Sequence, residues 1–86
     1  MDNRIIILRE KIDKIDEKLF SLIKERLVIT REMGIIKQEN KISIEDIDRE
    51  MEIIDRLLLN SNDTLSDTEL KRVFSIIFKF SKIMQK

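Results

Sequence analysis

Hydrophobic residues recur at alternating steps of three and four along the first forty positions of the chain. The series is Ile5, Leu8, Ile12, Ile15, Leu19, Leu22, Arg26, Ile29, Met33 and Ile36, with one polar member. This spacing is that of one face of an α-helix. Asp2 or Asn3 can cap the start, because a short polar side chain can accept a hydrogen bond from a backbone amide. The pattern therefore predicts one helix from about Arg4 to about Glu39.

Two shorter helices are predicted to follow a break in the pattern at residues 40–42. Ser43 can cap the second helix, with Asp46 at its third position. The apolar positions of this helix are Ile44, Ile47, Met51, Ile54 and Leu58. After a polar linker, Ser66 and Glu69 have the spacing of a capping box, which predicts the start of a third helix. The residues that this helix should turn toward a core are Leu70, Val73, Phe74, Ile77, Phe80 and Met84.

The fold class predicted from this pattern is all-α, with three helices in a single domain over residues 1–86. The 17 isoleucines would suit β-strands, but no proline and one glycine leave almost no turn chemistry for hairpins. A first helix of about 35 residues would be about 52 Å long. A compact domain of this size is about 30 Å across, so the helix would protrude with its apolar stripe bare. We therefore expect an intertwined homodimeric helical bundle, in which a second copy of the chain covers that stripe.

The composition excludes several classes of function. The chain contains no cysteine and no histidine, so it has no thiolate nucleophile, no imidazole base and no Cys/His zinc site. We expect no metal, no cofactor and no disulfide. Its 17 basic and 17 acidic residues balance, which gives no basic footprint for nucleic acid. The longest apolar run is four residues, far short of a membrane span, so we expect a soluble cytoplasmic protein.

Two cations of the first helix occupy positions where a core residue is expected. Arg26 lies between Leu22 and Ile29 in the apolar series, where a charge is costly unless it is paired or binds an anion. Lys37 follows eleven residues later on nearly the same face, about 16 Å away between Cα atoms. Both long side chains could reach one small ligand. Alternatively, Arg26 sets the helix register by pairing with a carboxylate of a partner chain.

Polar groups interrupt the apolar faces of the other two helices as well. In the second helix Asp46, Arg49 and Glu50 share a face with apolar residues, either as part of a site or as a surface salt-bridge set. In the third, Ser81 and Gln85 interrupt an apolar stripe, in a site or at a frayed end. Gly34 costs the first helix about 1 kcal/mol relative to alanine. Gly34 either permits the close approach of another backbone segment or has no structural role. A cavity lined by these groups would be rich in cations and would suit a small dianion.

Five short motifs occur in order along the chain. They are L-R-E-K-I-D-K-I-D-E-K-L at 8–19, E-R at 25–26, G-I-I-K at 34–37, D-I-D-R-E at 46–50, and finally Ser81 with Gln85. In this order and spacing they resemble the all-helical class of chorismate mutase, as a free-standing monofunctional domain. The resemblance runs from about Ile5 to Gln85. It implies an intertwined three-helix dimer that rearranges chorismate to prephenate on the route to phenylalanine and tyrosine.

The resemblance also implies which residues bind the substrate carboxylates. Arg26 matches the arginine that holds one carboxylate. Arg9 matches the arginine that reaches the second carboxylate from the other protomer. Arg49 and Ser81 match further pocket and carboxylate contacts.

The reacting part of the substrate is implied to meet four more side chains. Lys37 and Gln85 match the pair that donates hydrogen bonds to the ether oxygen of the breaking bond. Glu50 matches the acceptor for the substrate hydroxyl, with Asp46 beside it. Two alternatives stay open: an isochorismate–pyruvate lyase of the same fold, and a non-catalytic helical dimerisation module in which Arg26, Lys37 and Glu50 are freely replaceable.

Overall fold

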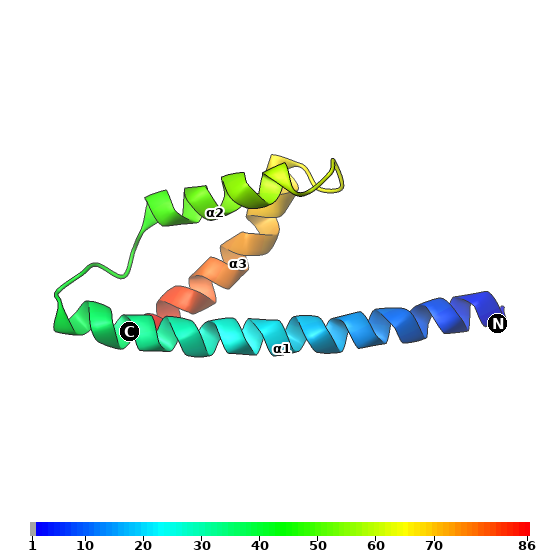
Figure 1. The fold of residues 1–86 in the computed structure, drawn as a ribbon, viewed down its shortest axis with the longest axis horizontal. Helices are drawn as coiled ribbons and strands as arrows, with labels where there is room; N and C mark the ends of the chain where they lie inside the picture. The colour runs from blue at the N-terminus through cyan, green and yellow to red at the C-terminus, as the bar shows by residue number, and fades with distance from the viewer. Residues whose placement is uncertain (1) are drawn as a thin grey trace.

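A computed structural model describes residues 2–86, which form three α-helices and no strand. The helices are α1 (Asn3–Glu39), α2 (Ile47–Leu59) and α3 (Asp67–Gln85). As Figure 1 shows, α1 runs the full length of the molecule, and α3 crosses from α2 back to the C-terminal half of α1. The principal extents are 57 × 25 × 16 Å. The predicted all-α class, with one very long helix, is confirmed.

The N-termini of α1 and α3 are capped as the sequence predicts. The Asp2 carboxylate accepts a 2.8 Å hydrogen bond from the Arg4 amide and so caps α1. Ser66 and Glu69 form the predicted capping box, with reciprocal bonds of 3.2 and 3.1 Å. Both starts are therefore set by residues local to each helix.

The start of α2 differs from the prediction. Asp46, and not Ser43, is its N-cap, and the Asp46 carboxylate accepts a 3.0 Å bond from the Arg49 amide. Lys41, two residues beyond the end of α1, is in the left-handed conformation with φ of 56°, and the Ile42 amide donates to the Lys37 carbonyl. The chain must then travel from α1 to α2, so the residues before Asp46 form a connection (Figure 1). A carboxylate is also favoured at the positive end of the helix dipole.

The core of the single chain is small and lies mainly between α2 and α3. Its buried members are Ile53, Ile54, Leu70 and Phe78, with Phe74 partly buried against them. Two other predicted core residues, Val73 and Phe80, are both 51% exposed. The crossing helix α3 is covered only along a narrow stripe, and these two side chains lie outside it.

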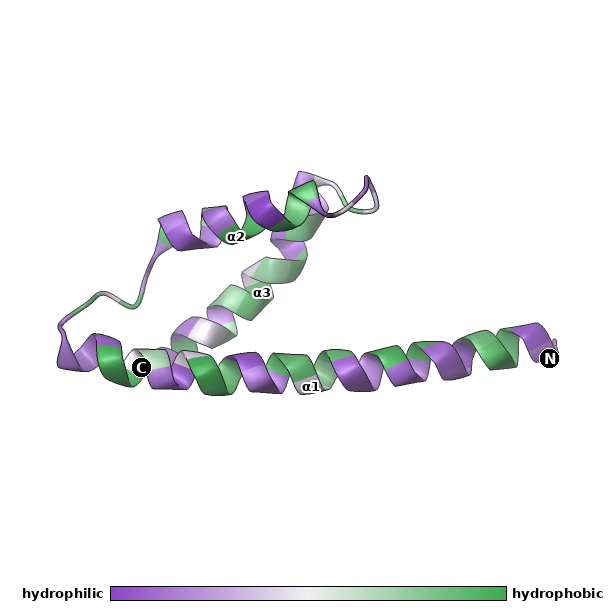
Figure 2. Ribbon diagram, viewed as in Figure 1, coloured by the Kyte–Doolittle hydropathy of each residue, from purple (hydrophilic) through white to green (hydrophobic). Residues whose placement is uncertain are grey.

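The N-terminal half of α1 has no cover among residues 2–86. α1 contacts α3 but not α2, and its buried residues, Thr30 and Gly34, belong to the C-terminal half. Apolar residues continue along the uncovered half (Figure 2). Five that belong to the predicted stripe are more than half exposed: Leu8, Ile12, Ile15, Leu19 and Leu22. None of the helices described combines the length and apolarity needed to span a membrane.

Candidate active site

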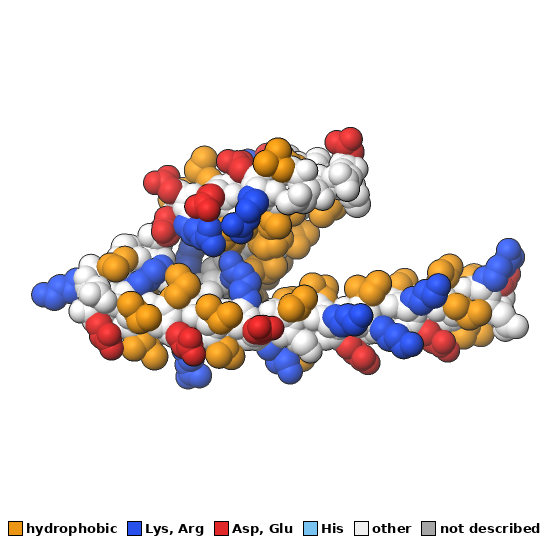
Figure 3. Space-filling model, viewed as in Figure 1, with side chains coloured by type: hydrophobic (Ala, Val, Ile, Leu, Met, Phe, Trp, Pro, Cys, Tyr) orange, Lys and Arg blue, Asp and Glu red, His pale blue; other side chains and the backbone are white. Residues whose placement is uncertain are grey.

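A cavity of about 410 Å³ lies where the three helices approach one another. It brings together seven of the eight predicted site residues: Arg26, Lys37, Asp46, Arg49, Glu50, Ser81 and Gln85. Figure 3 shows Lys and Arg side chains gathered in the hollow between α1 and α2. The fold thus joins polar groups that lie far apart in the sequence.

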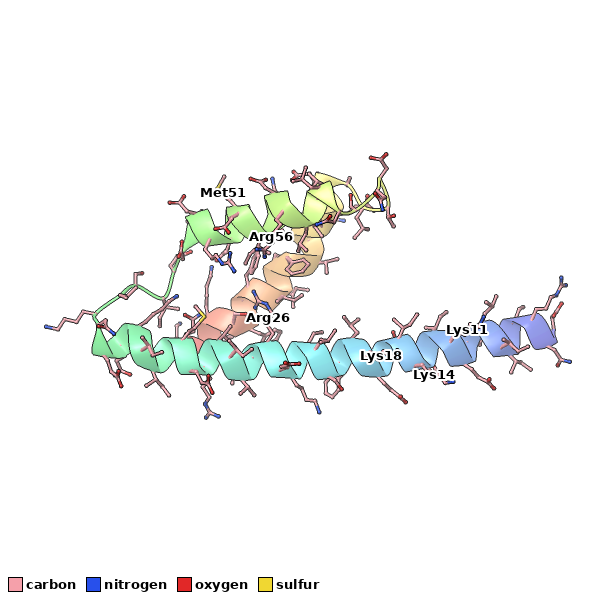
Figure 4. All side chains as sticks on the ribbon, in the orientation of Figure 1. Lys11, Lys14, Lys18, Arg26, Met51 and Arg56 are labelled. Carbon is pink, nitrogen blue, oxygen red and sulfur yellow. The ribbon has the colours of Figure 1, made fainter. Side chains whose placement is uncertain are left out.

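Arg26 is the cation at the base of this cavity. Its side chain extends from α1 toward α3 (Figure 4), where its guanidinium donates to the Ser81 hydroxyl and lies 5.8 Å from the Phe78 ring centroid. Burial and, to a smaller extent, the nearby positive charge of Arg49 lower the pKa of Arg26. Among the described residues Arg26 contacts a hydroxyl and a ring instead of a carboxylate. A partly buried cation without a counter-ion is a favourable place for an anionic ligand.

Ser81 itself is held rigidly. It is 5% exposed, and its hydroxyl also donates a 2.8 Å bond to the Ile77 carbonyl one turn earlier on α3. The hydroxyl therefore accepts from Arg26 while it is anchored to its own helix. This arrangement fixes the direction of the Arg26 side chain.

Lys37 of α1 and Gln85 of α3 both line the cavity. The Lys37 ammonium donates to the Ile44 carbonyl at 3.4 Å, a long bond for such a group. The Gln85 amide nitrogen donates to the Ser81 carbonyl at 3.2 Å, and the buried Gln85 Oε1 has no partner among the described residues. The Lys37 ammonium has three N–H groups and the Gln85 amide nitrogen has two, so each side chain has a donor beyond the one bond recorded for it.

Gly34 brings α3 to this position. A Cβ atom at Gly34 would lie 2.4 Å from the Gln85 carbonyl oxygen and 2.5 Å from the Gln85 Cα. Only a residue without a side chain permits this contact. The glycine is thus required for a close approach, as one of the two interpretations held, and that approach sets Gln85 beside α1.

The acidic side of the cavity is built from α2. Arg49 pairs with Glu52 at 2.9 Å, and this pair is half exposed. Glu50 instead pairs across to Lys82 on α3 at 3.0 Å, and Lys82 also contacts Glu45 at 3.3 Å. Lys82 was not among the predicted site residues, since a single lysine near a helix end has the pattern of a solvated position. The pair with Glu50 depends on the angle at which α2 and α3 cross, and the sequence does not give that angle.

Arg9 is the predicted residue that does not line the cavity. It precedes Arg26 by seventeen residues on the same helix, a distance of about 25 Å along the axis. Within one chain, the two arginines therefore do not share a site. No cluster of metal-ligating side chains occurs among residues 2–86.

The comparisons with known proteins agree on one family. Residues 8–86 match the family described as chorismate mutase type II. The bifunctional chorismate mutase/prephenate dehydratase of Escherichia coli K12 is 35% identical over 85 residues, which are 98% of this chain and 22% of that protein. This chain therefore spans about a fifth of the length of that relative.

Two further similarities cover nearly the whole of the other protein. The chorismate mutase of Methanocaldococcus jannaschii is 32% identical over 87 residues, which cover all of this chain and 88% of that protein. A solved structure, a conserved hypothetical protein from Pyrococcus furiosus, superimposes with a TM-score of 0.82 at 35% identity over the whole of both chains.

Proposed function

The chain belongs to the chorismate mutase type II family, and from that premise we propose that it rearranges chorismate to prephenate. The observation that carries the proposal is the cavity around Arg26, whose cation has no carboxylate partner among residues 2–86. Chorismate is a small dianion, and Arg26, Lys37 and Arg49 all line this cavity. Such a set of donors suits two carboxylates and a polarised oxygen.

The reaction asks for orientation and charge, which this site can supply. One C–O bond breaks as one C–C bond forms, with no covalent intermediate and no obligatory proton transfer, which suits a chain without Cys or His. Arg26, supported by Ser81, holds one carboxylate, and Arg49 adds a second cation. Holding the flexible substrate in its folded conformer removes an entropic part of the barrier.

Lys37 and Gln85 act on the ether oxygen, which gains negative charge in the transition state. A donor already fixed at that point stabilises the transition state more than the ground state. The long Lys37 bond to the Ile44 carbonyl is readily exchanged for one to the substrate. Glu50 accepts a bond from the substrate hydroxyl, with Asp46 next to it.

The role of Lys37 is tested by Lys37→Ala. We expect kcat to fall by about 100-fold or more, with a smaller change in KM, because the lost interaction belongs to the transition state. The assay is the loss of chorismate ultraviolet absorbance. A variant with an unchanged kcat and a raised KM would show that Lys37 only binds substrate.

We also propose that two copies of the chain share their active sites in an intertwined dimer. The chain exposes 7491 Å² at a mass of 10.3 kDa, whereas a compact monomer of that mass exposes about 5,400 Å². The excess of about 2,100 Å² per chain, or about 4,200 Å² for two copies, lies within the range of total area that obligate dimers bury. The bare half of α1 contributes to that area, and Arg9 of the second copy would complete the cation set.

Mixing two inactive variants tests the shared site. Arg9→Ala and Arg26→Ala chains each damage every site in their own dimers. After subunit exchange, a hybrid dimer regains one intact site, so roughly a quarter of all sites recover. No recovery, with exchange demonstrated, would contradict a shared site, and a monomeric mass by light scattering would contradict the dimer.

The same absorbance assay separates the alternatives. Purified protein is incubated with chorismate and, in parallel, with isochorismate. Turnover of isochorismate with release of pyruvate, and none of chorismate, would favour the lyase. A dimerisation module would be favoured if neither substrate is turned over and if Arg26 and Glu50 can be substituted without effect.

A further inference from the structure

Lys82 makes an ion pair that differs from the others recorded in residues 2–86. Its ammonium lies 3.0 Å from Glu50 Oε2 and 3.3 Å from Glu45 Oε1, so one lysine joins α3 both to α2 and to the connection before α2. The Lys82 and Glu50 side chains are 31% and 26% exposed. The helix-local pair of Lys71 with Asp67 is far more exposed. The Lys82 contact is therefore created by the tertiary fold at the edge of the site.

The contact leaves Glu50 with one oxygen engaged and one available. Lys82 bonds Oε2, and no bond to Oε1 is recorded among the described residues. Glu50 also lines the cavity proposed to hold chorismate. A carboxylate fixed through one oxygen presents the other as a directed acceptor for a hydroxyl.

The contact also changes the charge that a ligand meets. A dianion entering beside Glu50 would be repelled by an uncompensated carboxylate, and this repulsion is strong where water is partly excluded. The bonds to Glu50 and Glu45 raise the pKa of Lys82, so the lysine stays charged at neutral pH. Lys82 therefore offsets the acidic charge throughout the range in which the enzyme would operate.

We propose that Lys82 is a positioning residue for the substrate: it fixes the Glu50 carboxylate toward the cavity and offsets its charge against a dianionic ligand. The proposal rests on the proposed chorismate mutase function. It concerns a residue that acts through Glu50 and does not touch the reacting atoms.

Lys82→Met tests the proposal with little loss of packing. Lys82 separates the site cavity from a second groove between α2 and α3, and methionine keeps an unbranched stem in that wall. Lys79→Met is the matched control, because Lys79 lies one turn earlier on α3 and lines the second groove without lining the site cavity. Lys82→Arg keeps the positive charge. Circular dichroism and Tm establish that each variant is folded.

We expect Lys82→Met to raise KM for chorismate by about tenfold, with a smaller fall in kcat, because the loss acts mainly on substrate binding. Lys82→Arg should restore KM to within about threefold, and Lys79→Met should match the wild type. The effect of Lys82→Met should shrink to about twofold or less in a Glu50→Gln background, because the cavity-lining carboxylate that Lys82 offsets is then absent and Glu45, its other partner, does not line the cavity. A purely structural role would give the same effect in both backgrounds.

Two kinds of failure are distinguishable. If the wild type is active and Lys82→Met leaves its kinetic constants unchanged, this inference alone is overturned. The same holds if Lys82→Met raises KM equally in the Glu50→Gln background. An equal effect of Lys79→Met would also overturn it, since general charge would then explain the result. A wild type without activity on chorismate would overturn the proposed function and this inference with it.

Discussion

The contact between Gly34 and Gln85 allows one substitution to separate catalysis from stability. Gly34→Ala adds a Cβ that would lie 2.4, 2.5 and 2.8 Å from three backbone atoms of Gln85. Ordinary contact begins at 3.4 Å, so the end of α3 must retreat by about 1 Å. Since these atoms belong to the backbone, no side-chain rotation can relieve the overlap. Gln85 therefore moves with its helix.

Gly34→Ala has two effects on stability, and they have opposite signs: higher helix propensity stabilises the protein, whereas overpacking destabilises it. Only the displacement of Gln85 affects activity. Alanine stabilises a helix interior by about 1 kcal/mol relative to glycine. Overpacking of this size typically costs about 1–3 kcal/mol, so the net change in the free energy of unfolding should be about 2 kcal/mol at most. A misplacement of about 1 Å at a catalytic group can lower the rate by about 100-fold. Activity should therefore fall much further than stability.

The assay compares kcat/KM for chorismate with Tm in the same preparations. Glu32→Ala is the control, because Glu32 is an exposed residue of α1 two positions earlier and thus on the opposite side of the helix. We expect Glu32→Ala to keep wild-type activity and Gly34→Ala to lose about 100-fold. Wild-type activity in Gly34→Ala, with an equal or higher Tm, would refute the argument that this approach positions Gln85.

Two other substitutions give results of predictable sign. Gln85→Glu should make kcat/KM rise as the pH falls, because only a protonated carboxyl can donate to the ether oxygen, whereas the wild-type amide does not titrate. A pH profile parallel to that of the wild type would show that Gln85 is not a donor in the reaction. Asp46→Ala should destabilise the protein by about 1 kcal/mol through loss of the α2 cap. Ser43→Ala should leave Tm unchanged, and equal losses in both variants would contradict the assignment of the cap.

Local chemistry explains which parts of the fold were predictable from the sequence. The first helix and the Ser66–Glu69 capping box depend on residues within a few positions of each other, and both predictions are confirmed. The start of α2 was predicted three residues too early. Ser43 and Asp46 are both suitable caps, and the direction that the chain takes after Lys41 decided between them. No pattern within the second helix contains that information.

Most of the polar residues that line the cavity could be predicted from the sequence, but the contacts between them across the helices could not. Arg26 and Lys37 stand out because they interrupt an apolar series. Lys82 does not, since its partner Glu50 lies 32 positions away and meets it only through the crossing of α2 and α3. The exposure of Val73 and Phe80 has a similar origin, because helical periodicity identifies an apolar face without saying how much of it a neighbour covers.

The two halves of α1 link assembly to catalysis in the proposed dimer. The C-terminal half carries Arg26, Gly34 and Lys37 and contacts α3. The N-terminal half carries Arg9 and an apolar stripe that no other described part of the same chain covers. Among the described residues of one chain, the buried core has four apolar side chains, too few to stabilise a domain of this size alone. Association would therefore supply both the missing hydrophobic burial and the missing cation. Because both come from one rigid helix, a dimer that packs the stripe correctly also sets the position of Arg9, and folding, dimerisation and formation of the site become a single event.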